Sequence, residues 1–349
     1  MSGVGTINLI NSSATGDTTF SGIQSIADVS VKGAGDATIT YAATTVVGTA
    51  DVQNLTVDTY TGTVSILGVE TLNITTAGAN STLADLTATS ATAVTVAGDK
   101  NLTITADTTT GFNAVTSIDA SALTGKLNIT SSDTSLSKFT GGSGDDTIDG
   151  ATVVTKDDTI KGGAGSDTVS VSDASTAVDA EMVDFSNFEI LDFTTASSTA
   201  TLGTNFTAAG FTTIDATGAS LALTAGATLG TAAAPLEITG YAFNNAAAKF
   251  VLGGTDDAAD AATTGYSISS GIYTHTAGTA TFSDFFAAIA ATAAAGDVAG
   301  FVSGGSTYVF GEGANANATD DVFLKLTGLT ATAISDANGT QAANTVFVA

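Results

Sequence analysis

The stretch from Gly141 to Ser170 contains two copies of a nine-residue pattern, G-G-x-G-x-D-x-U-x, in which U is a large aliphatic residue. The first copy reads GGSGDDTID and the second reads GGAGSDTVS. Consecutive glycines let the backbone turn tightly and expose its carbonyl groups. The short run after each Asp alternates like a β-strand whose aliphatic residue points inward. The pattern is therefore typical of a parallel β-helix, in which equivalent turns of successive coils stack.

The spacing of the two copies predicts a metal site between them. They begin 21 residues apart, since 162 minus 141 is 21, which equals one coil of two nine-residue halves plus a three-residue insertion. Calcium takes about six to eight oxygen ligands, which the carbonyls and carboxylates of two stacked turns can supply. The residues of this predicted calcium site are Gly141, Gly142, Gly144 and Asp146 in the first turn, and Gly162, Gly163, Gly165 and Asp167 in the second.

A half-turn between the two copies lacks the glycines but keeps an acidic position and the aliphatic Ile160. It predicts a second, weaker calcium site on the opposite edge of the coil, with Asp157 or Asp158 as a ligand. The alternative interpretation is a glycine-rich loop in which the acids occur by chance. Two full copies in compatible register favour the metal site.

The composition favours a thin, repetitive β structure. The chain has 349 residues, of which 43% are hydrophobic but only 7% aromatic, with 39 glycines and one proline. Thin cores suit small residues, and aliphatic residues alternating with Thr, Ser or Asn indicate half-buried strands. Such runs span residues 6–10, 28–32, 37–41, 55–58, 63–67, 72–75, 94–97, 102–106 and 127–130.

We therefore expect an all-β protein in three parts. Residues 1–140 form a repetitive parallel β-solenoid, residues 141–230 a calcium-binding β-roll with continuing coils, and residues 231–349 a β-rich C-terminal domain with one short helix. Internal repeats support coils on both sides of the glycine loops. GVETLNIT at 68–75 recurs as NFEILDFT at 187–194, and TSIDAS at 116–121 recurs as TTIDAT at 212–217. Self-similarity of this kind indicates stacked coils with loop insertions of variable length.

The charge and the missing residue types exclude several classes of function. The formal net charge is −26, from 34 acidic and eight basic residues, all of them Lys. This argues against binding to nucleic-acid phosphates, and divalent cations would relieve the self-repulsion. The absence of cysteine excludes disulfides and thiol chemistry. The first residues, MSGVGTINLINSS, do not read as a signal peptide, and no apolar stretch reaches the roughly 18 residues of a membrane-spanning helix.

The sequence does not favour an enzyme. The only histidine is His275, which we interpret as an incidental strand residue because no G-x-S-x-G motif accompanies it. The zinc motif H-E-x-x-H and a phosphate-binding G-K-[ST] loop are also missing. Paired acids are numerous, as a glycosidase would need, but the chain has no Trp to serve as a sugar platform.

The last part of the chain carries a recognisable order of motifs. A helix is expected between Ser283 and Gly296, because Ser283 or Asp284 can cap it and Phe285, Phe286 and Ile289 share one face. GGSTYVF follows at residues 304–310 and DVFLKLTG at residues 321–328. This order resembles the C-terminal module of RTX proteins exported by type I secretion. Together with the Gly-Asp repeats and the Thr- and Ala-rich body, the chain resembles RTX-type bacterial surface-layer proteins, best their lattice-forming C-terminal region.

The resemblance implies an uncleaved C-terminal signal read by the type I secretion machinery, and folding outside the cell on meeting calcium. It also implies lateral assembly of the chain with itself into a two-dimensional lattice on the cell surface, anchored to lipopolysaccharide or another surface glycan. Two alternatives remain open within the same family. The chain can be an RTX-type secreted adhesin or surface-binding module, or the secretion module of an RTX exoenzyme.

Overall fold

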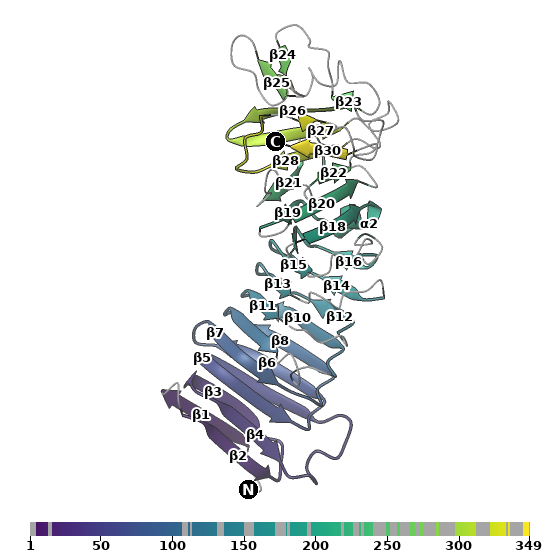
Figure 1. The fold of residues 1–349 in the computed structure, drawn as a ribbon. Helices are drawn as coiled ribbons and strands as arrows, with labels where there is room; N and C mark the ends of the chain where they lie inside the picture. The colour runs from purple at the N-terminus through teal and green to yellow at the C-terminus, as the bar shows by residue number, and fades with distance from the viewer. Residues whose placement is uncertain are drawn as a thin grey trace. The chain divides into compact units, whose positions relative to one another are not determined.

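The computed structural model is nearly all β, with 58% strand and 4% helix, and contains a parallel β-solenoid of about eight turns (Figure 1). The all-β solenoid predicted from the sequence is therefore confirmed. The described residues are 5–12, 16–106, 111, 114–130, 136–149, 157–171, 179, 182–193, 197–217, 220–225, 230–231, 234–239, 249–251, 257–258, 266–269, 272–275, 284–285, 297–311, 322–332, 334–335 and 345–348.

The chain divides into two compact units. The first comprises Met1–Val171 with Asp184–Phe188, and the second comprises Ser172–Val183 with Glu189–Ala349. The described strands of the first unit are β1 (Thr6–Ser12), β2 (Thr18–Ile23), β3 (Asp28–Ala34), β4 (Ala37–Tyr41), β5 (Val52–Leu67), β6 (Thr71–Ala77), β7 (Ser81–Thr87), β8 (Ala93–Gly98), β9 (Leu102–Ala106), β10 (Ser117–Leu123), β11 (Leu127–Thr130), β12 (Lys138–Thr140), β13 (Thr147–Asp149), β14 (Thr159–Lys161), β15 (Thr168–Val171) and β16 (Phe185–Ser186).

The strands of the first unit form two parallel ladders. One runs β1–β3–β5–β6–β8–β10–β12–β14–β16, and the other runs β2–β4–β5–β7–β9–β11–β13–β15. Strand β5 belongs to both ladders, so the separate strands expected at 55–58 and 63–67 are one. The chain turns between them at Thr59, whose φ of 54° places a non-glycine residue in the left-handed region. The glycine between the two expected strands, Gly62, lies three residues after this corner, where the register with β7 shifts.

Aliphatic side chains stack in register inside both ladders, as the alternating pattern predicts. In the first ladder the stack is Val29, Leu55, Ile74 and Val96, and in the second it is Ile104, Ile129, Ile148 and Val169. All eight side chains are at most 2% exposed. Each such burial stabilises the fold by about 1.5–3 kcal/mol relative to an exposed side chain, so the apolar column is a main source of stability.

A polar row runs along the outside of the first ladder. The Asn54 side-chain amide donates to Asp28 Oδ1 at 2.9 Å, and the Asn73 amide donates to Asn54 Oδ1 at 3.0 Å. The Thr95 hydroxyl donates in turn to Asn73 Oδ1 at 2.8 Å. Stacked Asn side chains of this kind reinforce the register that the backbone ladder sets.

The internal repeats adopt the same local structure in the two units. In the copy at residues 68–75, the Glu70 carbonyl accepts the amides of Thr92 and Ala93. In the copy at residues 187–194, the Glu189 carbonyl accepts the amides of Thr212 and Thr213. In the other repeat, Asp119 Oδ1 accepts the Ser121 amide at 3.0 Å, and Asp215 Oδ1 accepts the Thr217 amide at 2.9 Å. The repeats therefore mark equivalent coil positions, as the sequence predicts.

The second unit combines parallel coils with an antiparallel meander. Its described elements are β17 (Ile190–Phe193), β18 (Ser197–Leu202), α2 (Thr204–Ala209), β19 (Thr213–Asp215), β20 (Ser220–Ala225), β21 (Leu236–Thr239), β22 (Lys249–Val251), β23 (Asp257–Ala258), β24 (Tyr266–Ser269), β25 (Ile272–His275), β26 (Asp297–Ser303), β27 (Ser306–Gly311), β28 (Val322–Leu326), β29 (Ile334–Ser335) and β30 (Thr345–Val348). Parallel pairings join β17–β19–β21–β28 and β18–β20–β22, while β26, β27 and β28 pair antiparallel.

The C-terminal motifs form strands where they were expected. GGSTYVF leads into β27, and DVFLKLTG contains β28. The Lys325 ammonium lies 3.0 Å from Glu237 Oε1, and the Thr327 hydroxyl donates to the same oxygen. Both bonds lower the pKa of the Glu237 carboxyl, the hydroxyl bond most. Two residues of the motif thus fix β28 against β21.

The one helix described with its full bounds is α2, whose first turn is capped by Asp179, because Asp179 Oδ1 accepts the Gly203 and Phe206 amides at 2.8 Å each. The helix expected between residues 283 and 296 lies largely outside the described residues, of which only Asp284 and Phe285 fall in this range. His275 is in β25, as expected for a strand residue, and pairs with Tyr266.

Tyr60 provides a test of the packing at the corner of β5. Its side chain is 2% exposed, and its hydroxyl donates to the Gly35 carbonyl and, at 3.1 Å, to the Thr63 carbonyl. Burial raises the pKa of Tyr60 from 10.0 to about 12, and the charge of Asp36 adds to the shift. Because the folded state favours the protonated phenol, its contribution is fully present below pH 10 and is lost as the pH rises towards 12.

We expect Tyr60→Phe to lower the free energy of unfolding at neutral pH by about 0.5–1.5 kcal/mol, the usual net value of a hydrogen bond. Thermal unfolding can be followed by circular dichroism. The difference in melting temperature between wild type and variant should become smaller as the pH rises from 10 towards 12. A gap that stays constant over the whole alkaline range would contradict the buried, hydrogen-bonded phenol.

Candidate metal centre

The two glycine loops predicted to bind calcium stack directly on one another, as their spacing of 21 residues predicts. Thr147 pairs with Thr168 and Ile148 with Val169, so the strands that follow the loops are in parallel register. Between the loops, the Ala164 amide donates to the Gly142 carbonyl at 3.0 Å. The loops therefore form equivalent corners of two successive coils.

The glycines permit this close stacking. A Cβ at Gly141 would lie 1.8 Å from the Gly162 carbonyl oxygen, and a Cβ at Gly144 would lie 2.6 Å from the Gly125 oxygen. Positive φ is needed only in the second loop, at Gly163 (119°) and Gly165 (130°). The first loop thus keeps its glycines for space, whereas the sequence reasoning assigned them to backbone turning.

Asp146 and Asp167 point into the coil and accept backbone amides. Asp146 Oδ1 accepts the Leu127 amide at 2.7 Å and Oδ2 accepts the Gly142 amide at 2.5 Å. Asp167 Oδ1 accepts the Asp146 amide at 2.7 Å, and both aspartates are 1% exposed. Burial raises the pKa of the Asp146 carboxyl, although the two amide bonds oppose the shift. The loops are therefore joined by buried carboxylates, which we call the inner carboxylate row.

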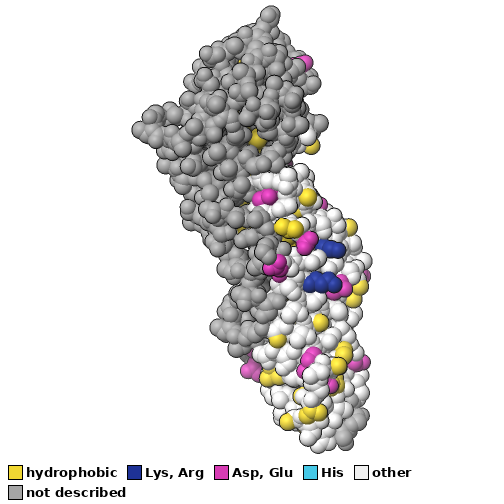
Figure 2. All heavy atoms as spheres, turned by 90° about the vertical axis from the view of Figure 1, so that its right-hand side faces the viewer, with side chains coloured by type: hydrophobic (Ala, Val, Ile, Leu, Met, Phe, Trp, Pro, Cys, Tyr) yellow, Lys and Arg dark blue, Asp and Glu magenta, His cyan; other side chains and the backbone are white. Residues whose placement is uncertain are grey.

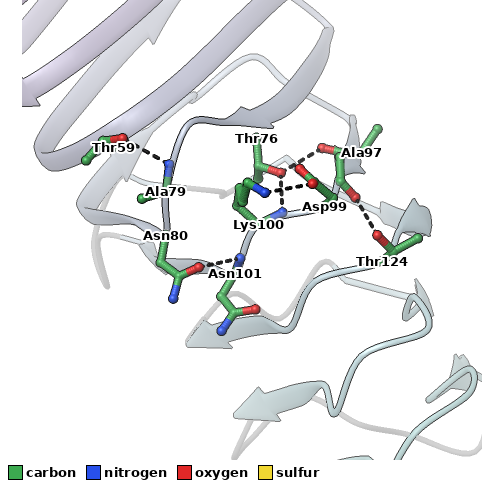
Figure 3. A network of polar contacts seen from close by, with 10 residues as sticks. Thr59, Thr76, Ala79, Asn80, Ala97, Asp99, Lys100, Asn101 and Thr124 are labelled. Atoms are coloured by element: carbon green, nitrogen blue, oxygen red, sulfur yellow. Dashed lines mark hydrogen bonds and ion pairs between the residues drawn. The ribbon is translucent and has the colours of Figure 1, made fainter.

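A second row of side chains runs along the same edge on the outside. Asn80 Oδ1 accepts the Asn101 amide at 3.1 Å, and Asn101 Oδ1 accepts the Lys126 amide at 2.9 Å. Further along, Asp145 Oδ1 accepts the Ser166 amide at 2.9 Å. Figure 3 shows the start of this outer row, where the Asn80 side chain points towards the backbone of Asn101. Sequence reasoning missed the row, although an Asn directly before β7 and before β9 was a visible signal.

Asp158 has the equivalent place in the other ladder. It directly precedes β14 and is 6% exposed, as Asp146 and Asp167 precede β13 and β15, while Asp157 beside it is exposed. Strand β14 pairs with β12 and β16, so these two acids are not brought to the stacked glycine loops. This agrees with the opposite edge that the sequence assigned to them.

The donor chemistry of the stacked loops is compatible with calcium, which prefers oxygen ligands. The available donors are the carbonyls of the stacked glycines and the carboxylates of Asp146 and Asp167. A carboxylate oxygen has two lone pairs, so one can accept an amide while the other faces a cation. Within the described ranges, no three or more His, Cys, Asp or Glu side chains converge in a way that could hold a metal ion. Calcium at these loops therefore stays a prediction.

Comparison with known proteins adds no assignment. The chain matches no protein-family model, and no curated protein sequence matches it significantly. Among the residues that the structure describes, no helix is both long and apolar enough to cross a membrane.

The two roles of Asp146, acceptor and charge, can be separated by substitution in the presence of a chelator. Asp146→Ala leaves the buried Leu127 and Gly142 amides without their acceptor, which costs about 1–3 kcal/mol for each group left unsatisfied. Asp146→Asn keeps an Oδ1 acceptor for Leu127 and removes the charge. We therefore expect the Ala variant to unfold at a lower temperature than the Asn variant, measured by circular dichroism.

The charge should appear in the pH dependence. Because burial raises the pKa of Asp146, the ionised carboxyl opposes folding above that pKa, and the penalty is relieved as the pH falls through it. The melting temperature of Asp146→Asn relative to wild type should accordingly be higher at neutral pH than at acidic pH. Identical relative stabilities at the two pH values would show that the buried charge carries no folding cost.

Proposed function

We propose that the chain is a structural surface-layer protein, which folds on extracellular calcium and assembles with itself into a two-dimensional lattice on the cell surface. The observation that carries the proposal is the stack of two glycine loops, with buried Asp146 and Asp167, in the last coils of the first unit. Calcium would bind the carbonyls of these loops and the two carboxylates, and would supply the positive charge that the buried acids require.

The architecture supports a structural role over catalysis. In-register backbone ladders run through the first unit, with aliphatic side chains inside and an Asn and Thr row outside. The face of the described residues in Figure 2 is mostly uncharged, with scattered hydrophobic side chains and acids close to lysines. Such an evenly polar surface suits repeated lateral contacts of modest strength.

The resemblance of residues 304–310 and 321–328 to RTX secretion modules supports export by a type I system. Lys325 and Thr327 also hold β28 against Glu237, so part of this motif has a structural role. The anchoring partner in this proposal is lipopolysaccharide or another surface glycan. The proposal includes no nucleic acid and no enzymatic activity.

Electron microscopy of the purified chain tests the proposal. With millimolar calcium we expect ordered sheets that disappear on chelation, and the same concentration of magnesium should not replace calcium. Asp146→Ala combined with Asp167→Ala should abolish the sheets, whereas the exposed Asp17→Asn serves as a matched control and should leave them intact.

A chain that folds with calcium but stays monomeric at every concentration would contradict the lattice. If that monomer binds isolated lipopolysaccharide or whole cells, the adhesin alternative would replace the lattice proposal. If sheets form equally well in chelator, the proposed lattice stands, but calcium has no role in its assembly.

A further inference from the structure

One core-facing corner position changes its chemistry along the first unit. Ser81 pairs with Leu102 and Leu102 with Leu127, and the pairing of Asn128 with Thr147 then places Leu127 beside Asp146. The pairing of Thr147 with Thr168 places Asp146 beside Asp167. All five side chains at this position are at most 3% exposed: Ser81, Leu102, Leu127, Asp146 and Asp167. The position is thus filled by neutral side chains in the earlier coils and by carboxylates in the later ones.

The bonds that join successive coils change at the same place. In the earlier coils the corner amide donates to a backbone carbonyl, from Ser81 to Asn101 at 3.0 Å and from Leu102 to Lys126 at 2.8 Å. From Leu127 onward the corner amide donates to a carboxylate instead, on Asp146 and then on Asp167, at 2.7 Å in both cases. Before Leu127 the corner amides are therefore accepted by neutral groups, since the amide of Tyr60, one coil earlier, donates to the Ser81 hydroxyl at 3.0 Å.

A buried carboxylate needs a compensating charge, whereas a backbone carbonyl or a leucine does not. Removing a charged group from water costs several kcal/mol unless a partner offsets it, by a rough general estimate. The outer row does not repeat this division, because it holds Asn80, Asn101, Lys126, Asp145 and Ser166 in turn, with a single acid. The change to buried acids is therefore confined to the inner position, at Asp146 and Asp167.

We infer that the first unit is divided at Leu127 into coils that fold without a cation and coils that a divalent cation completes. The coils up to β9 and β11, which have neutral corner side chains, would then present a preformed edge that includes the Leu127 amide. The coils that carry Asp146 and Asp167 would stack on this edge once a cation compensates the charge of the two carboxylates. This inference rests on the calcium part of the proposed function, and it adds that calcium controls only the later coils.

Hydrogen exchange with mass spectrometry on the full chain, in calcium and in chelator, tests the division. We expect β5 to β9 to keep their protection in both conditions. Strands β13 to β15 should be protected in calcium and lose that protection in chelator. The comparison is made within one molecule, so differences in overall stability between preparations do not enter.

A charge-removing variant gives the decisive comparison. Asp146→Asn with Asp167→Asn keeps an Oδ1 acceptor at each corner and removes both charges, so the calcium-dependent difference at β13 to β15 should vanish. The readout is this difference and not absolute protection, because the Asn variant also loses the acceptor of the Gly142 amide. Asp119→Asn, an exposed acid on the other ladder, is the matched control and should leave the calcium effect unchanged.

Three results would overturn the inference, and they have different consequences for the proposed function. If chelation exposes β5 to β9 together with β13 to β15, the solenoid responds as one unit, and calcium keeps its place in the proposed function. If neither segment responds to calcium, the division fails and calcium also leaves the proposed function. A calcium response that persists in the double Asn variant would place the cation away from these carboxylates and overturn the inference as well.

Discussion

The structure depends on the register between successive coils. Every coil of the first unit lies on the previous one through parallel backbone pairing, and this pairing stacks the aliphatic columns inside and the polar rows outside. Side chains at the corners must satisfy amides that the strands no longer pair, since a buried amide without an acceptor is costly. Asp146 and Asp167 do this with charge at buried amides, whereas Asn80 and Asn101 accept exposed amides without charge.

This difference links the fold to the proposed function. A solenoid closed only by backbone, aliphatic and amide groups would fold wherever the chain is made. Under the proposed function, buried carboxylates in the glycine-loop coils would make completion of the fold sensitive to cations, and this would keep the chain unfolded until its export. The overall charge of −26 acts in the same direction, because a compact chain repels itself until cations bind.

Much of the fold could be predicted from the sequence because period-two alternation and the glycine pattern are local signals. Strands β4, β9 and β11 have the bounds expected for them, and the loop spacing of 21 residues placed the glycine loops on one edge. The corner at Thr59 and the role of Asn101 could not be predicted, since they depend on which coil lies beside them. The reason for the glycines at Gly141 and Gly144 was also non-local, because the close neighbours belong to other coils.

The most direct test is a crystal structure of the calcium-loaded chain with anomalous scattering to locate the metal. The account predicts calcium at the stacked loops that carry Asp146 and Asp167, with Leu127 still bonded to Asp146, and none at the corners that carry Asn80 and Asn101. Calcium at the Asn corners, or stacked loops that hold no calcium in a crystal that binds it elsewhere, would contradict the account.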